Sequence, residues 1–209
     1  MSLSLRRANP RVPPDPPAAL HAPLFQEIVS SLEETVRHVV LDFGTASTDM
    51  LALLGQSRTR AEIVDLAHFG AIERLNTTEL GPELAAVANS LLPSRRPDDA
   101  IDLDFCWDFL NYLNLDALCT LMGAIGHRAR PGAFVHALIY YAERDMPEHP
   151  GRYVPTATGE LVNLGEPGPK VPAPRYSPEE LGRGMRPFVI DRARLLGNGM
   201  QEFLFQLAY

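Results

Sequence analysis

Residues 38–55 combine a short apolar run, a turn of small residues and the start of a helix. The run at 39–41 is apolar and mostly β-branched, Gly44 permits a sharp turn, and the short side chains at 45–48 can cap a helix over 50–54. A strand that feeds such a turn leaves backbone N–H groups and the positive end of a helix pointing into one cleft. The stretch therefore predicts either a ligand site in the turn or a turn whose glycine serves only the backbone.

Acidic and amide side chains follow two further apolar runs. Asp65 lies near the end of the run at 61–66, and Trp107, Asp108 and Asn111 follow the next alternating run. Open α/β sheets bind ligands at the carboxyl ends of their strands, so we expect these side chains at one edge of a sheet. Asp108 and Asn111 are candidate catalytic residues there. Trp107 is either the wall of a pocket or a core anchor, and Asp65 is either a ligand contact or a helix cap.

The order of the other elements predicts a parallel sheet that helices cover on both faces. Helical spacing of apolar residues recurs over 24–37, 80–92 and 115–125. The near-continuous apolar run at 133–141 is typical of an inner parallel strand, and His136 within it is expected to be a core histidine with a hydrogen-bond partner. Residues 67–99 contain no convincing strand pattern.

Two local motifs mark the end of the chain. Ser177 and Glu180, with proline between them, form a capping box that predicts a short helix to about Met185. The strand-like runs at 188–196 and 200–207 are joined by a Gly-Asn-Gly turn, which is typical of a hairpin.

The chain divides into a leader and one domain. Residues 1–23 are rich in proline and predict an extended leader, and residues 24–209 predict a single α/β domain. Within the domain, residues 143–175 carry seven prolines and predict a long loop over the cleft. Aromatic and histidine side chains on and beside this loop could form a lid over an acceptor; they are Tyr140, Tyr141, His149 and Tyr153.

Charge and composition exclude several classes of protein. The net charge is −7 and no long cluster of Lys and Arg occurs, which argues against nucleic acid as the main partner. The six histidines show no metal-ligand spacing, so no metal site is expected. The sequence lacks a signal-peptide pattern and a membrane span, so we expect a soluble, cytoplasmic protein.

The combination of these units resembles the class I S-adenosylmethionine-dependent methyltransferases. It comprises parallel βα units that finish in an antiparallel hairpin, a glycine turn after the first strand and an acidic residue after the second. The resemblance implies a three-layer, doubly wound α/β fold with a seven-stranded sheet of order 3-2-1-4-5-7-6, mostly parallel, in which the C-terminal hairpin supplies strands six and seven.

The resemblance also implies a site for S-adenosylmethionine. The family's first motif has an acidic residue and then three glycines at alternate positions; Asp42 and Gly44 match it, whereas Ala46 and Thr48 stand where further glycines are expected. By the same resemblance Asp65 would hold the ribose hydroxyls. The full set of implied cofactor contacts is Asp42, Gly44, Ala46, Asp65, Trp107 and Asp108.

Two functions follow from the resemblance. One is a methyltransferase that acts on a small-molecule or protein acceptor. The alternative is an inactive methyltransferase-like protein with a regulatory or protein-interaction role, which the replaced glycines favour. A partner protein or a second copy of the chain could contact the leader or the long loop.

Overall fold

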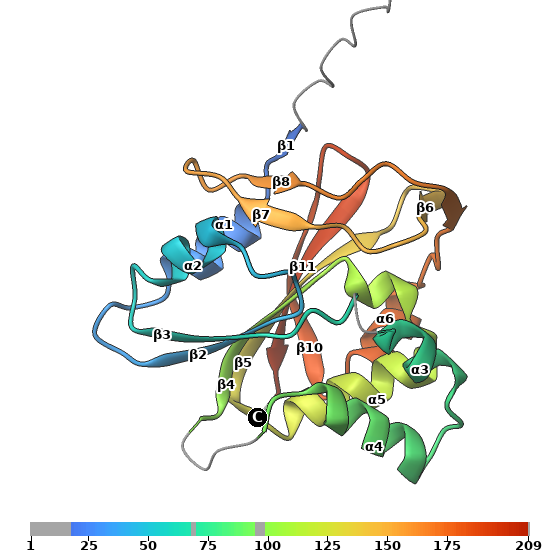
Figure 1. Ribbon diagram of the computed structural model, residues 1–209. Coiled ribbons are helices and arrows are strands. Elements are labelled where there is room, and N and C mark those ends of the chain that lie inside the picture. Colours follow the sequence, from blue (N-terminus) through green and yellow to red (C-terminus); the bar gives the residue numbers. More distant parts are fainter. Residues whose placement is uncertain (1–17, 68–69, 95–98, 209) are drawn as a thin grey trace, which may run out of the picture.

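A six-stranded mixed sheet forms the centre of the computed structural model, which describes residues 18–67, 70–94 and 99–208 (Figure 1). Its strands are β2 (His38–Asp42), β3 (Thr59–Ile63), β4 (Ile101–Trp107), β5 (Ala129–Tyr140), β10 (Phe188–Leu195) and β11 (Met200–Leu207). They lie in the order β10-β11-β5-β4-β2-β3. Strands β2 to β5 are parallel, and β11 runs antiparallel to both of its neighbours, β5 and β10. The predicted α/β class and the C-terminal hairpin are confirmed.

Strand three of the implied order is absent from the described part of the chain. The segment between β3 and β4 instead forms the helices α3 (Ala71–Thr77) and α4 (Pro82–Leu91). Leu75, Leu84 and Ala88 from these helices are buried in the core, so the segment is stabilised by helix packing. Strand β3 consequently forms one edge of the sheet. The remaining strand order matches the implied one.

Helices cover both faces of the sheet and complete three layers (Figure 1). The helices α1 (Pro23–Ser30) and α2 (Thr48–Leu54) pack on one face. On the other face, α3 and α4 pack together with α5 (Leu115–Gly126) and α6 (Pro178–Gly184). The predicted capping box at the start of α6 is present, and Ser47 caps α2 by accepting a hydrogen bond from the backbone N–H of Met50.

The first helix is shorter than the predicted 24–37. It ends at Ser30, and the hydroxyl of Ser31 donates to the carbonyl of Ile28 (2.7 Å). A serine side chain that bonds to the backbone in this way competes with the next helical hydrogen bond. Val36, which would have extended the apolar stripe, is 41% exposed.

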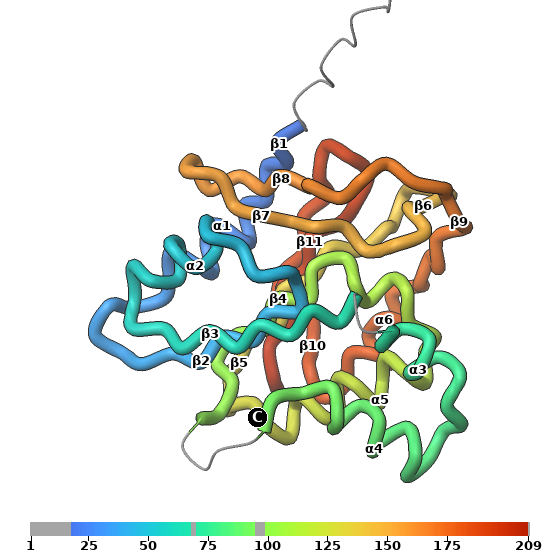
Figure 2. The backbone as a smooth tube through the Cα atoms, viewed as in Figure 1, coloured from blue at the N-terminus to red at the C-terminus, as the bar shows by residue number. Residues whose placement is uncertain are grey.

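The loop predicted at 143–175 contains four short strands (Figure 2). They are β6 (Asp145–Pro147), β7 (Tyr153–Pro155), β8 (Leu161–Asn163) and β9 (Lys170–Pro172). Strand β8 pairs with β7 and also with β1 (Ala19–Leu20), which lies in the predicted leader. The end of that leader therefore belongs to the folded domain, whereas residues 1–17 lie outside the described part. In the described residues, none of the helices has the length and apolar character that crossing a bilayer requires.

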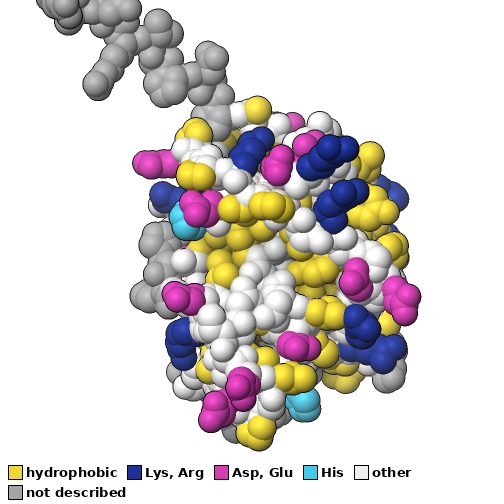
Figure 3. Space-filling model, turned by 90° about the vertical axis from the view of Figure 1, so that its right-hand side faces the viewer, with side chains coloured by type: hydrophobic (Ala, Val, Ile, Leu, Met, Phe, Trp, Pro, Cys, Tyr) yellow, Lys and Arg dark blue, Asp and Glu magenta, His cyan; other side chains and the backbone are white. Residues whose placement is uncertain are grey.

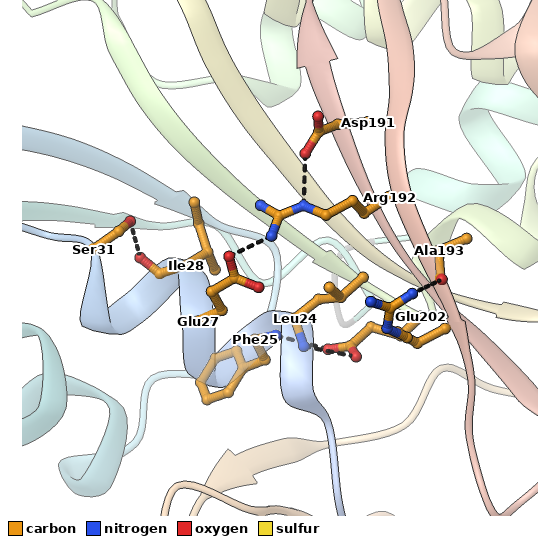
Figure 4. A network of polar contacts seen from close by, with 10 residues as sticks. Leu24, Phe25, Glu27, Ile28, Ser31, Asp191, Arg192, Ala193 and Glu202 are labelled. Atoms are coloured by element: carbon orange, nitrogen blue, oxygen red, sulfur yellow. Dashed lines mark hydrogen bonds and ion pairs between the residues drawn. The ribbon is translucent and has the colours of Figure 1, made fainter.

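A buried carboxylate ties the N-terminal helix to the sheet (Figure 4). Glu202 of β11 has no exposed surface and accepts hydrogen bonds from the backbone N–H groups of Leu24 (3.0 Å) and Phe25 (2.7 Å). Its Oε1 also lies 2.9 Å from Nε2 of His136 on β5. The expected core histidine is confirmed with this partner, although its Nδ1 has none among the described residues.

Candidate functional site

The turn after β2 is filled by a tryptophan from β4. The carboxylate of Asp42 is buried and accepts hydrogen bonds from the backbone N–H of Gly44 (2.8 Å) and from Nε1 of Trp107 (2.6 Å). Burial raises the pKa of Asp42, while these two hydrogen bonds lower it. A Cβ on Gly44 would lie 2.7 Å from Nε1 of Trp107. This glycine is therefore required by the close approach of the indole.

The next polar contact joins the turn to the end of β3. The hydroxyl of Thr45 donates to Oδ2 of Asp65 (3.0 Å). Both residues line a cavity of about 20 Å³, together with Gly44, Trp107 and Asp108. Ala46 is exposed and does not line this cavity. Of the residues implied as cofactor contacts, the structure therefore brings Gly44, Asp65, Trp107 and Asp108 to one place, with Asp42 hydrogen-bonded behind them.

Asp108 lies at the end of β4 and is fully buried. Its two carboxylate oxygens accept hydrogen bonds from the backbone N–H of Gly151, at 3.0 and 2.9 Å, and the hydroxyl of Tyr153 lies 3.5 Å from Oδ2. Burial raises the pKa of Asp108 to about 7, against the hydrogen bonds, which lower it. A carboxyl group with this pKa exchanges its proton at neutral pH and can act as a general acid or base.

Asn111 is engaged in the framework of the site. Its amide nitrogen donates to the carbonyls of Asp108 (2.7 Å) and Leu138 (2.8 Å), and its amide oxygen accepts from the backbone N–H of Tyr140 (2.9 Å). Because both N–H groups of the Asn111 amide donate to backbone carbonyls, the side chain joins the ends of β4 and β5. The structure does not support the prediction that Asn111 is catalytic.

A segment of the long loop covers the cavity. The hydroxyl of Tyr112 bonds to the carbonyls of Pro147 (3.0 Å) and His149 (2.8 Å). The ring of Tyr153 stacks on Trp107 with 6.0 Å between centroids. Residues 147–153 thus form a cover, here called the loop cover. Of the predicted lid residues, Tyr153 is buried in this cover, whereas Tyr141 is 47% exposed and the His149 side chain also faces solvent.

Asp104 is a buried acid that the sequence pattern did not single out. It alternates with apolar residues on β4 as a half-exposed strand residue would, yet it has no exposed surface. Its Oδ2 accepts a hydrogen bond from the thiol of Cys106 (3.4 Å), and its Oδ1 has no partner among the described residues. Burial raises the pKa of both groups, which favours their protonated forms.

Possible metal ligands and the surface charge also bear on which ligands the protein can bind. Within the described ranges, no three His, Cys, Asp or Glu side chains come together as metal ligands. On the face shown in Figure 3, basic and acidic side chains are interspersed.

Comparison with known proteins defines the fold. No family model matches the sequence, and neither does any curated protein. Among solved structures, the pyocyanin biosynthetic protein PhzM is 14% identical, with 88% of this chain and 54% of that chain covered and a TM-score of 0.50. The Burkholderia thailandensis 1,6-didemethyltoxoflavin-N1-methyltransferase is 17% identical, with 88% and 79% covered and a TM-score of 0.47. The glycopeptide N-methyltransferase MtfA is 12% identical, with 89% and 93% covered and a TM-score of 0.49.

At these identities, likeness to a solved structure establishes the fold alone. The match to PhzM shows that this chain shares the fold of that protein, and the order of the six strands is the one that the resemblance to the class I methyltransferases implied, without strand three. Activity and ligands have to be argued from the site.

Proposed function

We propose that this protein transfers a methyl group from S-adenosylmethionine to a small-molecule or protein acceptor. The proposal rests on one observation: Gly44, Asp65 and Asp108 line the same small cavity at the carboxyl ends of β2, β3 and β4. There β3 lies on one side of β2 and β4 on the other, which makes this edge the topological switch point of the sheet. Ligands of doubly wound sheets bind at such points.

The residues match this cofactor in kind. The carboxylate of Asp65 can accept hydrogen bonds from two ribose hydroxyls, and Gly44 would let a ligand approach the backbone once the Trp107 indole is displaced. They do not match it in space, because the cavity measures about 20 Å³, whereas small-molecule sites measure roughly 300–1,000 Å³. Binding therefore requires the loop cover or the indole of Trp107 to move.

Asp108 is the residue we propose for proton transfer. When bound, the cofactor would supply an electrophilic methyl group, so the protein mainly has to orient the acceptor. An acceptor N–H or O–H must also lose a proton, and the carboxylate of Asp108, with its pKa of about 7, can hold that proton. The hydroxyl of Tyr153 is the neighbouring group that can pass it on.

Titration of the full chain with S-adenosylmethionine and S-adenosylhomocysteine tests the proposal. Trp107 is the single tryptophan and lines the cavity, so we expect binding heat together with a change in tryptophan emission. Asp65→Ala should weaken binding by at least about fivefold, because the ribose hydroxyls lose their acceptor. Asp49→Ala, an exposed substitution on α2, should leave the affinity unchanged. The absence of heat and of a thermal shift at millimolar ligand would overturn the proposal.

One observation favours the alternative, an inactive methyltransferase-like protein with a regulatory or interaction role. The indole of Trp107 occupies the space beside Gly44 and is held there by its hydrogen bond to Asp42. Trp107 also adopts φ of +50°, a left-handed conformation that costs a residue with a Cβ about 1–2 kcal/mol. In this alternative the cavity is closed permanently.

Trp107→Gly separates the two functions. Glycine accepts the positive φ without strain and removes the indole, so in the inactive alternative it should create binding of S-adenosylhomocysteine where the unmodified protein shows none. Trp107→Phe keeps a ring in the cavity and should still not bind. Thermal unfolding of both variants checks that they are folded. If the unmodified protein binds the cofactor and Trp107→Gly raises the affinity by less than about tenfold, permanent closure of the cavity by Trp107 is refuted.

A further inference from the structure

A second and larger cavity lies at the tip of the C-terminal hairpin. It measures about 560 Å³ and lies between β1, the β7–β8 pair and the turn joining β10 to β11. These elements lie side by side at the top of Figure 1. Pockets of about 300–1,000 Å³ are typical of small-molecule sites. No sequence signal identified it, since its wall combines segments more than a hundred residues apart, around Leu20 and Leu196.

The lining of the large cavity carries positive charge in an acidic protein. The whole chain has a net charge of −7, yet the lining contains Arg194 and His21 and no Asp or Glu. Within the described residues, the Arg194 guanidinium makes no ion pair with a carboxylate; its hydrogen bond is to the carbonyl of Ala193 (3.3 Å). Its neighbour Arg192, by contrast, pairs with Glu27 and Asp191. Arg194 is therefore available to an anion.

Aromatic rings form another part of the lining. Tyr140 and Tyr153 both line the cavity while being only 8% and 6% exposed. Rings that are packed in this way offer a flat ligand a preformed surface. Apolar side chains, including Leu20 and Leu196, add to it.

Tyr153 connects the two cavities. Its ring lines the large cavity and stacks on Trp107, which lines the small one. Its hydroxyl lies 3.5 Å from Oδ2 of Asp108. A ligand hydroxyl or amine beside the Tyr153 hydroxyl would therefore be linked to the buried carboxyl of Asp108 through that hydroxyl.

We propose that the large cavity binds a small aromatic ligand carrying a carboxylate, with the carboxylate at Arg194 and the ring against Tyr140 and Tyr153. The positive charge of Arg194 favours an anionic group on the ligand. A carboxylate fits best, because a guanidinium binds it through paired N–H donors. That this ligand is the methyl acceptor rests on the proposed function. Its binding does not, because the lining of the large cavity includes none of Gly44, Asp65 and Asp108.

The test compares acids with their neutral amides on the full chain, without cofactor. Para-hydroxybenzoate and naphthoate, each beside its amide, are titrated to about 10 mM, where binding of only a few kcal/mol is still visible. Backbone amide signals in two-dimensional NMR report the site. We expect shifts at Tyr140, Tyr153 and Gly197, and binding of each acid at least about fivefold tighter than its amide.

Arg194→Gln should abolish this preference while keeping ring binding. Arg192→Gln is the matched control, because it removes a charge from the same strand that does not line the cavity. The proposal is overturned if no acid shifts the signals around the cavity, or if the preference for acids survives in Arg194→Gln. A failed cofactor titration would leave this result untouched, so the two proposals fail separately.

Discussion

Replacing Glu202 by alanine is expected to lower the free energy of unfolding by about 3 kcal/mol or more. The substitution removes the acceptor of two backbone N–H groups at the start of α1 and the partner of His136, all in the buried interior. Buried donors left without an acceptor lose the hydrogen bonds that water supplies in the unfolded state. Denaturant unfolding measures the loss, and amide exchange should show faster opening of α1 than of β11.

The matched control for this substitution is Glu27→Ala. Glu27 also carries a carboxylate that binds α1 to the hairpin, through Arg192, but its side chain is 56% exposed. Exposed ion pairs contribute about 0–1 kcal/mol, so this variant should unfold almost as the unmodified protein does. Equal losses in the two variants would refute the role assigned to Glu202.

Replacing Asp108 by asparagine is expected to change how stability depends on pH. An unperturbed aspartate has a pKa of about 4, whereas burial raises the pKa of Asp108 to about 7. Between these values the folded protein binds a proton that the unfolded chain does not bind. The group therefore stabilises the fold fully below about pH 4, and this contribution is lost as the pH rises through 7.

The size of the effect follows from the shift. About three pKa units correspond to roughly 4 kcal/mol. The free energy of unfolding of the unmodified protein, relative to Asp108→Asn, should thus fall by up to this amount between pH 4 and 8. The other acids whose pKa burial raises, Asp42 and Asp104, are present in both proteins and cancel in the difference. Asp116→Asn, an exposed change on α5, should give a flat difference, and a flat difference for Asp108→Asn would contradict the assignment.

The parts of the fold that sequence could predict are those set by local chemistry. The capping box at Ser177 and the Gly-Asn-Gly turn of the hairpin each act over a few residues, and both occur where expected. The apolar run that gives β5 is similarly self-contained. The convergence of Gly44, Asp65 and Asp108 was also predictable, because parallel strands end at one edge.

The remaining features depend on contacts between distant residues. The indole of Trp107 on β4 reaches Asp42 on the neighbouring strand β2, 65 residues earlier in the chain, and Gly151 bonds to Asp108 from a loop that follows β5. A Cβ on Gly151 would lie 2.6 Å from the ring of Tyr153, so the glycine permits this closeness, yet its sequence context reads as an ordinary turn. Such contacts depend on the packing of the whole domain, which hydrophobic periodicity does not encode.

The shortened sheet has a consequence for self-association. Its two edge strands, β3 and β10, are the places where the edge of another molecule can pair and extend the sheet. Strand β3 is five residues long and carries Arg60 and Glu62, which pair with each other at 2.6 Å. Strand β10 changes register between Ile190 and Arg192, which interrupts its ladder. The charged pair on β3 and the irregular pairing of β10 therefore both disfavour extension of the sheet by a second molecule.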